Sequence, residues 1–210
     1  MQDAIKLYPE NRERLDTFTI INCEHKDLFW RLIGHTAILY KYKATGQLMV
    51  FESTTLNKYT GNSGVQLTPF GLWLAHYPGK VYARTPEFQD SRGDGKDYDY
   101  RRIQLAEAFI KTHLGTSYPD LKTWSGKMKL ILSALDFRLF GVDLLTYKGD
   151  DKGIFCTELV IMLLQYCGIV TQMMSSYAAY EYEPDDTRGN KEKFEDELLR
   201  CRYGKEVRLK

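Results

Sequence analysis

The sequence predicts an α+β fold in which an antiparallel sheet packs against a central buried helix. Segments rich in β-branched and aromatic residues fall between residues 17 and 84, whereas helical spacing of apolar residues dominates from residue 100 onward. Strands followed by helices are typical of the α+β class rather than of alternating α/β folds. A late run from Cys156 to Cys167 is apolar on nearly every side, and a helix of that kind is a buried one.

The first half of the chain predicts the sheet. A first strand is expected over residues 17–21, followed by a short helix or turn from His25 to Leu32. A hairpin follows, with strands over 34–42 and 47–53 around the turn Ala44-Thr45-Gly46. The remaining expectations are a polar loop (56–68), a short helix with Pro69 at its first position (68–75) and a third paired strand (80–84).

The second half predicts helices. A surface loop over 89–99 precedes an amphipathic helix over 100–114, with Gly115 just past its end. Residues 119–150 form an apolar segment, which we expect to be an inserted, helical lid-like element or part of the core. The domain is therefore expected to span 1–187. Residues 188–210 are expected to be a charged tail with a solvated helix (191–200) and a frayed end.

Length, charge and cysteine spacing exclude several classes of protein. The chain has 210 residues, which suits one domain, and its 29 basic and 28 acidic residues give a net charge of +1, which argues against a dedicated nucleic-acid surface. No apolar stretch is long enough for a transmembrane helix, and residues 1–16 lack the apolar core of a secretory signal, so a cytoplasmic location is expected. The four cysteines show no Cys-x-x-Cys spacing, so neither a disulfide framework nor a zinc site is predicted.

Cys156 is the candidate nucleophile. It stands at the first turn of the predicted buried helix, where unpaired N–H groups and the helix dipole favour a thiolate. The alternative is ordinary core packing, because Cys156 shares a helical face with Val160 and Leu163. Cys167 lies at the opposite end of that helix and is interpreted as structural, and Cys23 and Cys201 lie in polar segments.

A cysteine nucleophile needs a base, and His35 is the best candidate because it opens an otherwise apolar strand. Its alternative is a hydrogen-bonded core histidine. Glu52 lies on the partner strand, where a buried carboxylate needs a partner. A four-residue loop, Lys43 to Gly46, would place Glu52 opposite Ala37 and diagonal to His35 on the same face. A loop one residue shorter or longer would place the two on opposite faces.

Three motifs in this order resemble those of a known family. They are Gly34-His35-Thr36-Ala37, then Val50-Phe51-Glu52-Ser53, then Phe155-Cys156-Thr157-Glu158-Leu159-Val160. Together they resemble the circularly permuted papain-fold hydrolases of the NlpC-like superfamily, most closely the YiiX-like group. The resemblance implies that Cys156 is the nucleophile, His35 the general base and Glu52 the group that orients it. It also implies an oxyanion site at the Cys156 N–H, a substrate-binding role for Tyr118 in the segment from Gly115, and no cofactor or metal.

The expected function is therefore a cysteine-dependent hydrolase or acyltransferase acting on an amide, ester or thioester carbonyl. Peptides, peptidoglycan-type amides and lipid acyl groups are all compatible substrates, as is peripheral contact with a membrane. One alternative is a non-enzymatic binding module on the same scaffold. Another is an interaction protein that uses its charged C-terminal residues. The sequence does not indicate the oligomeric state.

Overall fold

The computed structural model describes residues 9–26, 34–55, 57–89, 96–118, 154–172, 186–189, 192–199 and 201–210. Two expectations fall outside these residues: most of the short helix or turn after His25 and the lid-like segment over 119–150.

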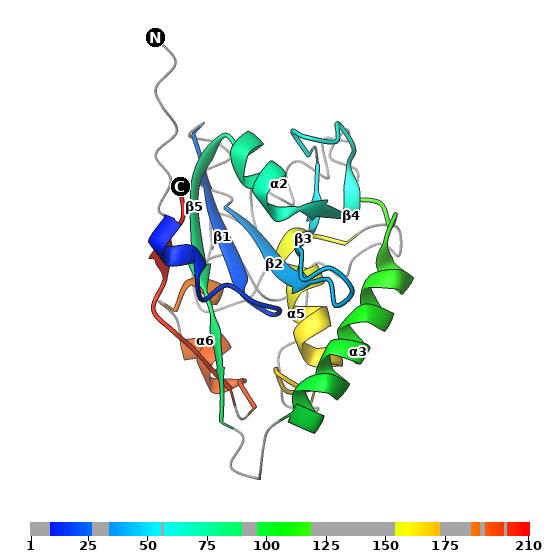
Figure 1. Ribbon diagram of the computed structural model, residues 1–210, viewed down its shortest axis with the longest axis vertical. Coiled ribbons are helices and arrows are strands. Elements are labelled where there is room, and N and C mark those ends of the chain that lie inside the picture. Colours follow the sequence, from blue (N-terminus) through cyan, green and yellow to red (C-terminus); the bar gives the residue numbers. More distant parts are fainter. Residues whose placement is uncertain are drawn as a thin grey trace, which may run out of the picture.

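A six-stranded antiparallel sheet forms the centre of the molecule (Figure 1). Its order is β4-β3-β2-β1-β5-β8. The strands are β1 (Ile20–His25), β2 (His35–Lys41), β3 (Leu48–Thr54), β4 (Gly64–Pro69), β5 (Gly79–Arg84) and β8 (Val207–Arg208). A separate two-stranded sheet pairs β6 (Pro86–Phe88) with β7 (Cys201–Tyr203).

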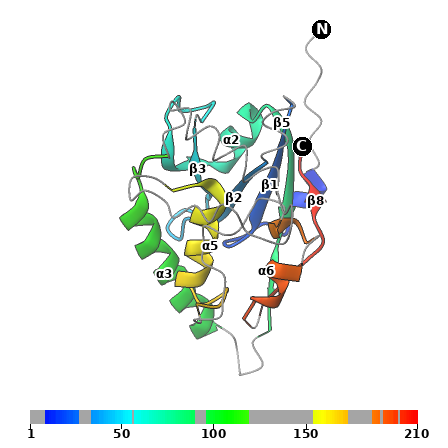
Figure 2. The ribbon, with the colours of Figure 1, turned by 180° about the vertical axis from the view of Figure 1, so that it is seen from behind.

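Helices cover both faces of the central sheet. Helix α5 (Cys156–Tyr166) and helix α3 (Lys96–His113) share one core with side chains such as Ile38 and Phe51, and Figure 2 shows both helices in front of the sheet. Helix α2 (Phe70–His76) packs on the other face against Leu39 and Val50. Because side chains alternate along β2 and β3, these strands contribute residues to a separate hydrophobic core on each face of the sheet.

The smaller elements lie towards the two ends of the chain. They are the 3₁₀ helices η1 (Pro9–Arg12) and η3 (Asp186–Arg188), and the short helix α6 (Glu192–Asp196). Among the described residues, no helix is both long and apolar enough to cross a bilayer.

The α+β class, the antiparallel sheet and the buried cysteine helix are confirmed. All the described residues of α5 except Glu158, Met162, Gln165 and Tyr166 are buried. The hairpin also has the register expected for a four-residue loop, since Tyr40 pairs with Met49 and Lys41 with Leu48. The short helix after Pro69 and the strand near residues 80–84 form as predicted, within one or two residues.

Two strand predictions were wrong in position or type. The first strand begins at Ile20 rather than Thr17, because Phe18 has a left-handed φ of 68° that interrupts extended backbone. The predicted loop over 56–68 ends in strand β4, which pairs with β3 and also exchanges backbone hydrogen bonds with Gly115 and Thr116. Glycines and polar residues concealed this strand, because its partners lie elsewhere in the chain.

The later part of the chain also differs from its prediction. Helix α3 begins at Lys96, inside the expected surface loop. The expected solvated helix over 191–200 is shorter, and its Phe194 is fully buried. The expected frayed end instead supplies β7 and β8, and Leu209 is fully buried in the core beneath α2. These short strands alternate single apolar residues with charged ones, so their sequence resembles that of a solvent-exposed tail.

The packing of the C-terminal residues gives a stability prediction. Leu209→Ala should lower the free energy of unfolding by about 2–5 kcal/mol, because it leaves a cavity in a closed core. Val207→Ala, at a side chain that is 37% exposed in the same segment, is the matched control and should cost less than about 1 kcal/mol. Urea unfolding followed by circular dichroism measures both. Equal and negligible effects would show that this segment does not pack as described.

Candidate active site

The hairpin brings His35 and Glu52 together. His35 Nε2 lies 2.8 Å from Glu52 Oε2, and the Glu52 side chain is only 2% exposed. Both side chains point to the α2 face of the sheet. The register requires this, because Glu52 lies opposite Ala37, and Ala37 is two residues along β2 from His35. The sequence-predicted pair therefore forms a direct, buried ion pair.

Two further donors hold the Glu52 carboxylate. Its Oε1 accepts hydrogen bonds from Asn57 Nδ2 at 2.8 Å and from the indole Nε1 of Trp73 at 2.9 Å. Asn57 also donates to Thr68, and its side-chain oxygen accepts the backbone N–H groups of Tyr59 and Thr60, which fixes its orientation. The carboxylate is thus fully paired, which offsets the cost of its burial.

Sequence reasoning missed Asn57 and Trp73. A buried carboxylate implies donors nearby, but the sequence does not say which element supplies them. Trp73 reaches Glu52 through the packing of α2 on the sheet, and Asn57 reaches it through a loop that is held against Thr68 of β4.

Cys156 stands at the first residue of α5, as predicted, and is 7% exposed. One contact caps this end of the helix, and two attach it to the sheet. The Glu158 carboxylate accepts the N–H of Phe155 at 3.1 Å, and Ser53 Oγ donates to the Ile154 carbonyl at 2.5 Å. The Thr157 hydroxyl contacts that of Thr36 at 3.4 Å.

The thiol and the imidazole approach from opposite faces of the sheet and meet where β2 begins. The His35 side chain and the backbone N–H of Thr36 both act on the Cys156 thiol, and each lowers its pKa. Because Nε2 of His35 is bound to Glu52, Nδ1 is the ring nitrogen left for the thiol. Gly34, with a left-handed φ of 71°, leads the chain into this position, a conformation that favours glycine.

The electrostatics favour a thiolate–imidazolium pair. Burial alone raises the pKa of Cys156, but the hydrogen bond and charge of His35 outweigh it and hold the thiol pKa below its ordinary value. Burial lowers the pKa of His35, but its hydrogen bonds to Cys156 and Glu52 outweigh that effect and raise the pKa from 6.5 to about 10. These two shifts favour a thiolate on Cys156 beside an imidazolium on His35.

Tyr77 completes the surroundings of His35. Its ring lies nearly parallel to the imidazole, at 6.4 Å between centroids and 13° between planes, and also stacks on Trp73 at 5.0 Å. Cys23, paired with His35 across β1 and β2, forms a side-chain hydrogen bond with Tyr77. Burial raises the pKa of both the Cys23 thiol and the Tyr77 hydroxyl, so both stay neutral beside the charged pair.

Comparison of the sequence with protein-family models and with curated proteins gives no match. The geometry of the site is therefore the only basis for assigning it a function. Among the residues that the structure describes, no group of three histidine, cysteine or acidic side chains is arranged to hold a metal ion.

The other sequence candidates take the following places. Tyr118 lies beside the start of α5, with its ring edge-on to Phe155, the residue before Cys156, at 5.6 Å. Cys167 and Cys201 are buried, and burial raises the pKa of each to about 12. His113 Nδ1 donates to the Phe109 carbonyl near the end of α3, which fits its structural interpretation.

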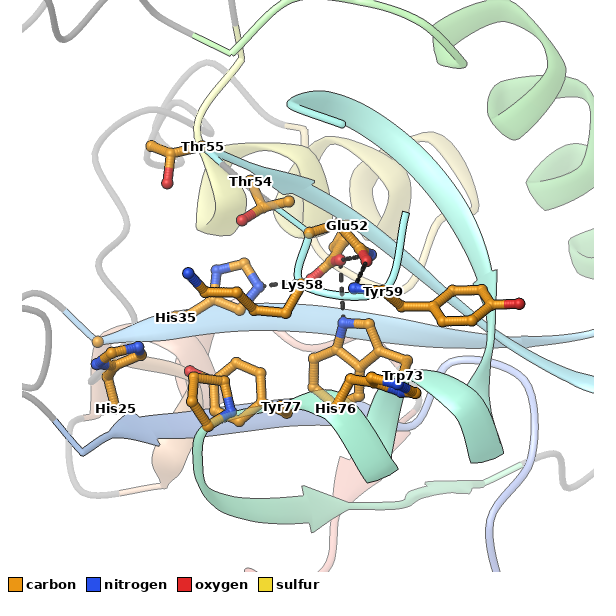
Figure 3. A pocket seen from close by; sticks show the side chains of 13 residues that line it. His25, His35, Glu52, Thr54, Thr55, Lys58, Tyr59, Trp73, His76 and Tyr77 are labelled. Carbon is orange, nitrogen blue, oxygen red and sulfur yellow. Dashed lines mark hydrogen bonds and ion pairs between the residues drawn. The ribbon is translucent and has the colours of Figure 1, made fainter. Parts of the chain in front are cut away.

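A cavity of about 250 Å³ opens on the α2 side of His35 (Figure 3). The end of β3 contributes Thr54, the loop after it contributes Lys58, and α2 with the residue after it contributes Trp73 and Tyr77. His35 and Glu52 form part of its wall. His35, the predicted base, therefore faces a cavity beside the thiol.

The charge on His35 gives a titration prediction. A pKa of about 10, raised from 6.5, means that the pairing stabilises the fold fully below pH 6.5 and loses this contribution as the pH rises through about 10. The imidazole resonances of His35 in ¹H–¹⁵N NMR should not titrate between pH 6 and 8, roughly the range in which an ordinary histidine does. Glu52→Gln should move the midpoint down towards the ordinary value. A wild-type midpoint near 6.5 would contradict the pairing.

The thiolate gives a second prediction. Iodoacetamide at pH about 6 should label Cys156 ahead of the other three cysteines, because only its pKa is lowered. Mass spectrometry of tryptic peptides identifies the site. His35→Ala should slow labelling by at least about tenfold, since a thiol of ordinary pKa is almost wholly protonated at that pH. Tyr166→Ala, an exposed position on the same helix, is the control variant. An unreactive Cys156 would refute the thiolate.

Proposed function

We propose that this protein is a cysteine-dependent hydrolase or acyltransferase that acts on an amide, ester or thioester carbonyl through an acyl-enzyme on Cys156. The observation that carries the proposal is the grouping of Cys156 with His35, whose imidazole is hydrogen-bonded to the buried Glu52. A nucleophile, a base within hydrogen-bonding reach and a group that orients the base are what nucleophilic catalysis by a thiol requires.

Each residue has a defined task in this reaction. The Cys156 thiolate attacks the carbonyl carbon, and the backbone N–H groups at the start of α5 stabilise the oxyanion. The His35 imidazolium gives its proton to the departing group, and the neutral imidazole then takes a proton from water or another acceptor. Glu52 remains ionised and holds the ring, with Trp73 and Asn57 keeping the carboxylate in place.

The permuted papain-like arrangement of the NlpC-like superfamily, YiiX-like group, belongs to the same proposal. It is supported by the order of the groups along the chain: histidine at the start of a strand, carboxylate on the next strand, cysteine late at the start of a buried helix. In this arrangement Tyr118 lies where it would contact substrate near Phe155. Peptide, peptidoglycan-type and lipid acyl groups are all substrates that this chemistry would accept.

An acyl-enzyme is the measurable consequence. Incubation with a panel of activated esters and thioesters should add one acyl mass to the intact protein, located on Cys156 by peptide mapping. Cys156→Ala should abolish the adduct, and His35→Ala should slow its turnover by about 10²–10⁴-fold. Cys201→Ala, which removes a different buried thiol, controls for non-specific acylation. Acylation spread over several cysteines, or unaffected by His35→Ala, would count against the enzyme.

A further inference from the structure

The position of the cavity beside His35, relative to the Cys156 thiol, indicates which part of a substrate the cavity can hold. Its walls include His35 and Glu52 (Figure 3), whereas Cys156 is not among its lining residues. A substrate spanning both would have its carbonyl at the thiol and one of its two halves in the cavity.

The chemistry of the proposed reaction decides which half this is. On attack a Cys156 Sγ–C bond forms, and collapse of the intermediate breaks the bond from that carbon to the leaving N, O or S atom. The leaving atom takes its proton from His35, so the departing half is the one next to the imidazole. Water then adds to the acyl carbon and returns a proton to His35. The C–S bond breaks, which restores the thiolate. The cavity therefore suits the leaving half.

The charge of the cavity favours an anion. Lys58 is exposed on the loop after β3, and no acidic group among the described residues forms an ion pair with it. In Figure 3 its side chain extends towards the His35 end of the cavity. Glu52 is the one acid among the described lining residues, and its charge is already matched by His35, Asn57 and Trp73.

The size and walls of the cavity restrict the ligand further. About 250 Å³ is less than a drug-sized site and suits a group of a few heavy atoms. The rings of Tyr59, Trp73 and Tyr77 supply flat, partly apolar walls, and Lys58 stands as the cation.

We propose that this cavity binds the leaving half of the substrate and that Lys58 selects a leaving group ending in an anionic oxygen group, a carboxylate or a phosphate. This inference rests on the proposed function, since it uses His35 as the proton donor. It names the substrate class that the sequence left open: acyl compounds whose departing amine, alcohol or thiol carries a negative charge.

Matched thioesters with one common acyl group test the preference. The leaving thiols are β-mercaptopropionate, its neutral amide, and mercaptoethylphosphonate, so the carboxylate and phosphorus sources are compared directly. The anionic leaving groups should give kcat/KM about fivefold higher than the neutral one, the size expected for one exposed charge pair, and added NaCl should reduce the ratio. Lys58→Ala should remove the preference. Lys43→Ala, at the far end of β2, should not.

A fourth substrate tests the side of the bond. The S-ethyl thioester of succinate carries its carboxylate on the acyl half. A Lys58-dependent preference for this compound, rather than for the anionic leaving groups, would overturn the assignment. Equal kcat/KM for charged and neutral leaving groups would overturn the anion selection, while the measured turnover would leave the proposed function standing.

Binding without turnover separates the two proposals. Propionate, propionamide and ethylphosphonate are titrated into the Cys156→Ala protein, and the imidazole resonances of His35 and His76, which both line the cavity, are followed by NMR. Tighter binding of the anions, lost in Lys58→Ala, supports the cavity even if no thioester is turned over and the proposed function fails. Propionate binding no tighter than propionamide would refute it.

Discussion

The buried contact between His35 and Glu52 is the interaction on which the rest of the site depends. A carboxylate that is 2% exposed is costly unless all of its oxygens are paired, and here a hairpin, a loop and a helix each supply a donor. A slip of one residue in the hairpin would turn Glu52 to the α5 face and leave His35 without its partner. The four-residue turn between β2 and β3 therefore sets the chemistry as well as the fold.

That pairing also separates one thiol from three others of the same type. All four cysteines are buried, and burial by itself raises every one of their pKa values. Only Cys156 has an imidazolium against it, and that imidazolium persists because Cys156 and Glu52 together raise the pKa of His35. Neutral groups on the far side of the ring, Cys23 and Tyr77, add no competing charge. Selective ionisation thus follows from position in the fold rather than from residue type.

The sequence predicted the parts of the site that depend on local rules. Strand alternation limited the hairpin to a few registers, of which the one for a four-residue loop places His35 and Glu52 on one face, and this register forms. The position of Cys156 at a helix start was predicted directly. Asn57 and Trp73 could not be predicted, because their roles arise from tertiary packing. Strand β4 was missed because its own pattern is weak, and the C-terminal strands also pair with strands far along the chain.

The C-terminal strands have a consequence for the site that their charged sequence conceals. After β8, Leu209 fills the core under α2, and the Lys210 ammonium donates to the carbonyls of Leu74, Ala75 and Tyr77. A cation at these carbonyls satisfies the otherwise unpaired end of the helix. This is the end that carries Tyr77 against His35, one turn beyond the Trp73 that binds Glu52. The last residues of the sheet therefore help to hold the first residue of β2, which is the predicted base, in its working position.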